Sequence, residues 1–238
     1  MKRTIGLASL VAAAAIWQAA GAFAGSVSFP DFSSTNGLEL NGAAIATDDV
    51  LRLTPSAGGE VGSAFTDRKE VRTDRSFETR FKFSIHDGSI TPAEGMAFVL
   101  QPGSTDALGG SDLTALGYAE IDPSLVIEFD LFENPGSGDP GGNHVAFMRD
   151  GDSQSHLVAA SPAFDLEGGN RWAWIKYSAE KKRTKVYVND ANSKPSQALV
   201  TLNKRLKSVL GDKARAGFTA STGETENAMF DVLSWKLK

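Results

Sequence analysis

Hydrophobic and polar residues alternate along much of the chain, with the period of two that is typical of half-buried β-strands. In residues 76–85 (SFETRFKFSI), phenylalanine or threonine occupies alternate positions from Phe77 to Phe83, and charged residues fill the positions between them. Residues 171–190 (RWAWIKYSAEKKRTKVYVND) contain two such segments with a charged turn at 180–183 between them. This arrangement predicts a β-hairpin.

Two segments are more continuously apolar, as strands covered on both faces would be: residues 95–102 (GMAFVLQP) and 124–132 (SLVIEFDLF). Further strands are predicted at 214–222 and 231–238, whereas only residues 201–211 suggest one or two helical turns. Gly, Pro, Asn and Asp separate these segments at short intervals. The sequence therefore predicts an all-β fold, an antiparallel β-sandwich.

The N-terminal segment has the pattern of a secretory signal peptide. Lys2 and Arg3 precede an apolar run, and Ala22-Phe23-Ala24 offers a small-x-small cleavage site. We therefore expect residues 1–24 to be removed and residues 25–238 to form the mature domain in an extracellular or periplasmic compartment. No second apolar segment is long enough to span a bilayer, so we expect no membrane span.

Composition narrows the class of partner. The formal net charge is −5, and removal of the basic leader makes the mature chain still more acidic, which argues against nucleic acid and anionic lipid as partners. The chain has no cysteine although it is predicted to be exported. Its stability must therefore come from packing, bound ions or association into a homo-oligomer, not from disulfides.

Residues 128–144 (EFDLFENPGSGDPGGNH) gather polar side chains at the end of a predicted buried strand. On a strand, Glu128 and Asp130 point to the same face, while Phe129 and Leu131 point to the other and anchor it in the core. Two adjacent carboxylates repel each other unless a cation lies between them. The spacing thus favours a bound cation at the strand end.

The loop after this strand adds further ligand-type side chains. Asn134 and Asp139 supply oxygen atoms, the ligands that calcium requires. His144 supplies a nitrogen, which suits manganese, zinc or another transition ion. The mixture predicts two ions side by side, bridged by shared carboxylates. The alternative is a solvated acidic turn, and the ligand spacing differs from that of an EF-hand loop.

The stretch resembles the metal loop of the legume-type (L-type) lectins, the concanavalin A-like family. The family pattern Glu-x-Asp-x-Phe-x-Asn-x4-Asp-Pro-x3-His is matched by Glu128, Asp130, Phe132, Asn134, Asp139-Pro140 and His144. Segments such as SFETRFKF, PAEGMAFVLQP and ARAGFTASTGETENAMFDVLSWKLK also resemble family segments, in the family's order. The resemblance implies that residues 25–238 form a concanavalin A-like jelly roll that binds a glycan and is not an enzyme.

In that family, two ions lie beside the sugar site. By resemblance, the transition ion, usually manganese, is held by Glu128, Asp130, Asp139 and His144. Calcium is held by Asp130, Asp139, the side-chain oxygen of Asn134 and the backbone carbonyl of Phe132. Calcium would fix the Asn134 amide as a donor to a sugar hydroxyl, and such preorganised donors matter more than contact area. The Phe132 ring would offer its face to a pyranose, or else pack in the core.

The first of the remaining sugar contacts departs from the family pattern. The family has Ala-Asp-Gly, joined by a cis peptide, where this chain has Ala93-Glu94-Gly95. The Glu94 carboxylate still accepts two hydroxyl hydrogens, but it reaches about 1.5 Å further along one extra carbon–carbon bond. We expect sugar binding with altered selectivity, and weakened binding is the alternative.

Two other loops are assigned by the same resemblance. A backbone N–H of the second loop would come from Gly109 or Gly110, between which the sequence does not decide. The fourth loop corresponds to residues 223–227 (GETEN), where Glu224 and Thr225 are the candidate sugar contacts. A plain hairpin tip is the alternative for this loop.

Two other functions would use the same sandwich. Laminarinase-type glycoside hydrolases carry Glu-x-Asp-x-x-Glu, and Glu128, Asp130 and Glu133 satisfy that spacing. A retaining hydrolase would need its two glutamates about 5–5.5 Å apart, and on this strand only a bulge would bring them together. A structural or adhesion module would instead keep the ions for stability without binding sugar, and Glu94 is the best support for it.

The remaining histidines give no sign of a catalytic triad. The sequence places His86 and His156 in polar turns, without a recognisable nucleophile motif nearby. We therefore expect both to be surface residues and disfavour a triad hydrolase.

Overall fold

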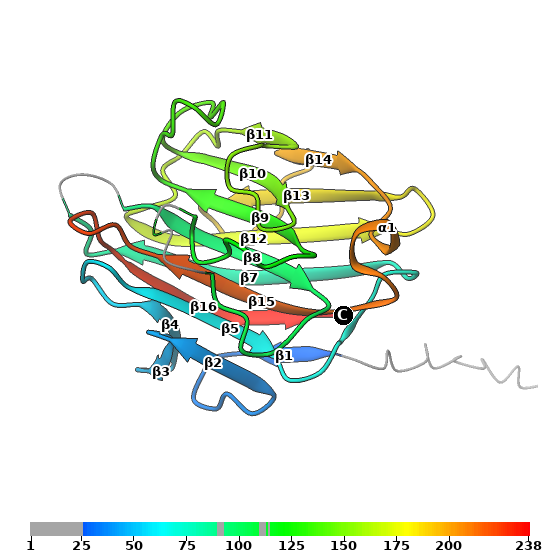
Figure 1. Cartoon of the computed structure of the whole chain (residues 1–238), viewed down its shortest axis with the longest axis horizontal. Coiled ribbons are helices and arrows are strands. Elements are labelled where there is room, and N and C mark those ends of the chain that lie inside the picture. The colour runs from blue at the N-terminus through cyan, green and yellow to red at the C-terminus, as the bar shows by residue number, and fades with distance from the viewer. Residues whose placement is uncertain (1–25, 90–92, 110–112, 114) are drawn as a thin grey trace, which may run out of the picture.

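The predicted β-sandwich is confirmed in a computed structural model of the chain, which describes residues 26–89, 93–109, 113 and 115–238. Two antiparallel sheets of 8 strands each pack face to face (Figure 1). The predicted signal peptide, residues 1–24, lies outside the described residues. Among the residues described, no helix has the length and apolar character needed to cross a membrane.

Each sheet consists of a path of seven paired strands and one strand beside it. The first sheet contains, in spatial order, β14 (Val200–Asn203), β13 (Arg183–Asn189), β12 (Gly169–Ser178), β7 (Phe77–His86), β16 (Met229–Leu237), β4 (Val50–Thr54) and β3 (Ile45–Thr47), with β1 (Val27–Phe29) also paired to β16. The second contains β11 (Val158–Ala160), β10 (His144–Arg149), β9 (Leu125–Asp130), β8 (Gly95–Gln101), β15 (Lys213–Ser221), β5 (Val61–Thr66) and β2 (Leu38–Gly42), with β6 (Val71–Arg72) also paired to β15.

The strands that the hydrophobic pattern predicted are confirmed as β7, β8, β9, β12, β13, β15 and β16. Buried and more accessible residues alternate along β7, and β12 pairs with β13 as the predicted hairpin. Every residue of β8 and β9 is buried, because both strands lie in the interior of the second sheet and are covered on both faces. The one helix of the described residues, α1 (Lys207–Leu210), follows β14 within the predicted helical segment.

Aromatic side chains fill the space between the two sheets. They come from β7, β8, β9, β15 and β16, and are Phe81, Phe98, Phe129, Phe218 and Trp235. The Phe218 ring contacts both Phe81 and Trp235, with centroids 4.9 Å apart in each pair. Because burying one such side chain stabilises the fold by about 1.5–3 kcal/mol, Phe129 holds the inner face of β9 firmly in place.

A second, smaller cluster lies on the outer face of the second sheet. There the described residues of segment 102–124, which exclude 110–112 and 114, form no helix or strand and place Leu116, Tyr118 and Ile121 against sheet residues that include Val126 and Met148. Val126 points to the face opposite that of Phe129, as alternation along a strand requires. The segment therefore shields the outer face of β9, where polar residues would otherwise meet solvent.

Candidate metal centre

The register of three neighbouring strands brings the predicted transition-ion ligands to one face. On β9, Glu128 lies opposite Ala97 of β8 and Ala146 of β10. Asp130 lies opposite His144, two residues along from Ala146, so His144 faces the same side as the two carboxylates. Small alanine side chains beside Glu128 leave room for its carboxylate.

The other neighbour of Asp130 is a glycine for a steric reason. Gly95 of β8 pairs with Asp130, and a Cβ at Gly95 would lie 2.5 Å from the Phe129 carbonyl oxygen. Gly95 also has a φ of +154°, a backbone conformation that other residues rarely adopt. The close approach of β8 to the end of β9 therefore depends on this glycine.

The carboxylates of the site are buried without a cationic partner from Lys or Arg. Glu128 and Asp130 are 2% and 3% exposed, and the Asp139 side chain is 2% exposed. Among the described residues, no lysine or arginine forms an ion pair with any of the three. Burial raises the pKa of Asp130 well above its usual range, and the Glu128 carboxylate adds to the rise. Such a cluster is costly unless another cation compensates its charge.

His144 is held in the form that binds a metal. Its Nδ1 lies 2.8 Å from the carbonyl oxygen of Gly141 and donates to it, so Nε2 keeps its lone pair. Burial lowers the pKa of His144, which favours the neutral imidazole. Nε2 is buried without a hydrogen-bond partner, as is Oε2 of Glu128. These two unsatisfied atoms fit a site for a transition ion.

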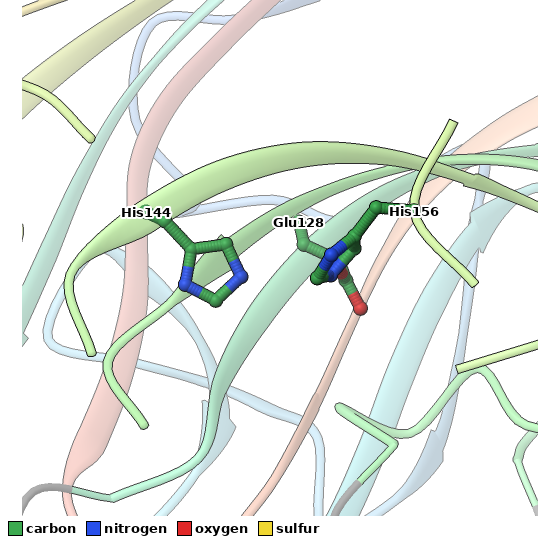
Figure 2. Close-up of side chains that lie close together, drawn as sticks. All are labelled: Glu128, His144 and His156. Carbon is green, nitrogen blue, oxygen red and sulfur yellow. The ribbon is translucent and has the colours of Figure 1, made fainter. Parts of the chain in front are cut away.

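His156 belongs to the same site, and the prediction that it is a surface residue was wrong. It lies between β10 and β11, and its side chain is only 10% exposed. Its Nε2 is 3.3 Å from Oδ1 of Asp139 and 3.6 Å from Oε2 of Glu128. The nearby Glu128 carboxylate is the main cause that raises the pKa of His156. Figure 2 shows His156 beside Glu128 and His144.

Tyr118 is a second residue of the site that sequence reasoning missed. Its hydroxyl, at the buried end of segment 102–124, donates a hydrogen bond to Oε1 of Glu128. Burial raises the pKa of Tyr118 well above its usual range, and the negative charge of Glu128 adds to the rise. Tyr118 thus fixes one oxygen of Glu128 and leaves the other directed at His156. No local motif marked this tyrosine.

The loop after β9 wraps around the two aspartates. The Phe132 N–H donates to Oδ1 of Asp130 at 2.7 Å, and the Asn134 N–H donates to Oδ2 of Asp139 at 2.6 Å. The Ser137 N–H donates in turn to the Asn134 carbonyl at 2.9 Å. These contacts gather the four residues predicted to bind calcium into one turn.

Glu94 lies beside this loop, as the resemblance implies. It is 5% exposed, and its carbonyl oxygen accepts the Leu131 N–H at 2.9 Å. Its charge also contributes to the raised pKa of Asp130. The expected cis peptide is not found: the cis bond of the described residues is Asp122–Pro123, and Ala93–Glu94 is trans. A non-proline cis bond costs about 3–4 kcal/mol, and the trans form avoids that cost.

The other two predicted sugar loops are placed differently. The Gly109 N–H donates to the Gly117 carbonyl at 2.8 Å, so this N–H already has an acceptor within segment 102–124. Gly110 lies outside the described residues. Glu224 and Thr225 are exposed in the connection between β15 and β16.

The geometry required for a glycoside hydrolase is not present on β9. Its pairing with β8 and with β10 continues through Asp130 without a register shift, so no bulge turns Glu133 toward Glu128. Glu128 is buried, whereas Glu133 is exposed. The triad hydrolase has no better support, because His86 ends β7 and directs Nε2 to Asp231 at 3.0 Å. The prediction of a polar turn at His86 was therefore also wrong.

Comparisons with known proteins agree with this architecture. The family model of the legume lectin domain matches residues 24–238. A lectin from Leucomphalos mildbraedii is 30% identical over 231 residues, which cover 88% of this chain and 93% of that protein. The seed lectin of Lotus tetragonolobus superposes with a TM-score of 0.76 at 23% identity, over 90% of this chain and 97% of that one. The acidic lectin of winged bean, solved with methyl-α-D-galactose, gives 0.75 at 23% identity, over 89% and 96%.

Proposed function

The chain belongs to the legume lectin family of carbohydrate-binding proteins, and from this premise we propose that it binds a glycan at a site preorganised by a calcium ion and a transition-metal ion. One observation carries the proposal: three buried carboxylates and two imidazoles meet at the end of β9 without a lysine or arginine of the described residues to pair them. An enzyme is not needed to account for this arrangement, and the Leucomphalos mildbraedii relative is named a lectin.

The residues of the metal loop would divide between two ions. The transition ion, manganese or a substitute, would be held by Glu128, Asp130, Asp139 and His144. Calcium would be held by Asp130, Asp139, the side chain of Asn134 and the carbonyl of Phe132. When bound, the ions supply positive charge that compensates the buried carboxylates and stiffens the loop.

The sugar would bind at the rim of this loop. Asn134 and Phe132 are both partly exposed there, so an amide donor and a ring face are available next to the buried ligands. Glu94 would accept sugar hydroxyls from the β8 side, with a selectivity changed by its longer side chain. Glu224 and Thr225 remain predicted contacts, and their exposure supports a role in selectivity. Oligomerisation also remains a prediction.

Secretion is part of the proposal. Residues 1–24 have the charge and apolar pattern of a signal peptide, and the family match begins at residue 24. The mature protein would therefore meet glycans in an extracellular or periplasmic compartment. N-terminal sequencing of the exported protein tests this, because cleavage after Ala24 would expose Gly25.

A glycan array, probed with and without a chelator, tests the proposed function. We expect retention of a glycan subset that is lost on chelation and restored by calcium and manganese. Asn134→Ala should abolish retention with little loss of folded protein, because its side chain is partly exposed. Asn192→Ala, in the exposed connection between β13 and β14, is the matched control and should bind as the wild type does.

Two outcomes would overturn the proposal. Metal-dependent stability without retention of any glycan would identify a structural or adhesion module. Release of reducing ends from a glucan would identify a hydrolase, against the register and burial of Glu128 and Glu133.

A further inference from the structure

We propose that His156 is a direct ligand of the transition ion. The site then has two imidazoles and prefers zinc over manganese more strongly than a site with one imidazole would. This inference rests on the transition-ion site proposed above. It changes the identity of the ion and adds a residue that the metal-loop motif does not contain.

The spacing of the side chains supports a shared ion. One ligand atom each from Glu128, His144 and His156 lies within 4.8 Å of the others. Oδ1 of Asp139 lies 3.3 Å from Nε2 of His156 and 3.9 Å from Nε2 of His144. Two ligands held about 2.0–2.2 Å from one ion are about 2.8–3.6 Å apart at octahedral or tetrahedral angles. The His156 distances therefore fit one coordination shell.

The alternative role for His156 is that of a hydrogen-bond donor to the carboxylates. Its distances of 3.3 Å to Asp139 and 3.6 Å to Glu128 are longer than the 2.7–2.9 Å of charge-assisted hydrogen bonds. Oε2 of Glu128, which faces His156, remains without a hydrogen-bond partner, and so does the 0% exposed Nε2 of His144. A single ion among the three side chains would satisfy both atoms, whereas a donating His156 leaves Nε2 of His144 unsatisfied.

The fold holds His156 at this place. β11 pairs with β10, and the Leu157 N–H donates to the Phe147 carbonyl at 2.8 Å, immediately after His156. An isolated bridge between Arg149 and Asp152 makes a turn directly after β10. The chain therefore turns back over the end of β9 and presents the imidazole to it. His156 and His144 meet edge to face, with ring centroids 5.3 Å apart.

A second imidazole changes the preference of the site. Imidazole nitrogen suits zinc, copper, iron and nickel, whereas carboxylate, carbonyl and water oxygens suit manganese, magnesium and calcium. A site of Glu128, Asp130, Asp139 and His144 supplies three oxygen-donor side chains and one nitrogen. Addition of His156 makes two nitrogens, so zinc should gain more than manganese does.

X-ray absorption on the zinc-loaded wild-type protein tests the proposal without any variant. We expect outer-shell scattering from two imidazoles on the ion. One imidazole would overturn the inference and leave the proposed lectin function intact. If the protein binds neither zinc nor manganese, the proposed metal-dependent function is itself wrong. Failure of the His156 inference and failure of the proposed function are therefore distinguishable.

Metal competition then measures selectivity. In His156→Ser, we expect zinc affinity to fall by about 100-fold or more, at or beyond the upper limit for losing a residue outside the coordination shell, and manganese affinity by less, so that the zinc-to-manganese ratio drops. His86→Ser, which changes a histidine bonded to Asp231 elsewhere in the fold, is the control and should leave the ratio unchanged. If His156→Ser weakens both ions equally, His156 only positions the carboxylates and the inference fails. Thermal melting in chelator, where neither protein holds an ion, shows whether both variants are folded.

Discussion

Two strands of this protein bury carboxylates, and the protein treats the two places differently. On β16, Asp231 is 3% exposed and accepts hydrogen bonds from Nε and Nη2 of Arg52 at 2.9 Å and 2.8 Å. His86 adds a third contact at 3.0 Å. On β9, Glu128 and Asp130 are equally buried, but the described residues bring no lysine or arginine to them. Buried negative charge is thus neutralised by the chain itself in one sheet, whereas in the other the proposed function assigns this task to a bound cation.

The difference separates a structural ion pair from a binding site. The Arg52 guanidinium binds the Asp231 carboxylate through two hydrogen bonds within the folded chain, so the charge of Asp231 is compensated without a bound ion. At β9, Oε2 of Glu128 and Nε2 of His144 have no hydrogen-bond partner, and the proposed ion would satisfy both. Unsatisfied buried groups in a native structure call for an explanation, and a ligand supplies one here. A chelator should therefore destabilise the site at β9 and leave the Arg52–Asp231 pair unaffected.

The largest expected effect comes from removing the ions. An ion at 1,000 times its Kd stabilises the folded state by about 4 kcal/mol, so chelation should lower the Tm by about 8–16 °C in a domain of this size. Calorimetry with and without chelator measures the change. Arg52→Met should show the same drop, because its site is independent of the ions. A Tm that does not move on chelation would contradict the whole comparison.

The next largest effect is expected from Asp130→Asn, whose thermal stability relative to the wild type should depend on whether ions are present. Asp130→Asn removes a charge that both ions are expected to share, so with ions present the variant should melt near the chelated wild type. In chelator it should be at least as stable as the wild type, because burial and Glu128 already raise the pKa of Asp130 and disfavour its charged form. Melting curves under both conditions, with isothermal titration of each ion, give the result. Binding of both ions at wild-type affinity would show that Asp130 is not a ligand.

Arg52→Met breaks the buried ion pair with Asp231, the site that the comparison sets against β9. It leaves buried Asp231 with only His86, and we expect a loss of about 3 kcal/mol, the lower end for a broken buried pair because the Arg52 side chain is 19% exposed. The loss should be the same with ions and with chelator, as measured by urea unfolding. Arg72→Met is the control: Arg72 pairs with Asp74 at 2.9 Å, but both are exposed, so stability should not change measurably. A metal-dependent loss in Arg52→Met would mean that the two sites are coupled.

The sequence predicted the parts of the site that are local in the chain. Alternation along β9 placed Glu128 and Asp130 on the face opposite Phe129, and the structure has them there. His144 was predicted from its spacing in the loop, and it begins β10 as the partner of Asp130, across the long connection 131–143. Such features depend on strand period and on residues that follow β9 in the same stretch of chain.

Residues that reach the site through tertiary packing were not predictable in this way. Tyr118 arrives on an irregular segment whose path is set by packing on the sheet, and His156 arrives because β11 folds back onto β10. Arg52 and Asp231 are 179 residues apart, so no local pattern could pair them. The one signal in the sequence for His156 was its position, because it follows the metal loop after a single further strand. The polar residues around it obscured this signal.

The smallest effect on stability, and the sharpest test of the sugar site, is expected from Glu94→Asp. The change removes one methylene from a 5% exposed side chain, which should cost about 1 kcal/mol or less. It also withdraws the carboxylate by about 1.5 Å, so the ranking of glycans on an array should change while both ions remain bound. Glu133→Asp, at an exposed position in the same loop, should leave the ranking unaltered. If Glu94→Asp also leaves it unaltered, Glu94 serves only the charge balance around Asp130, and this buried acid, directly before β8, belongs with the metal site instead of the sugar contacts.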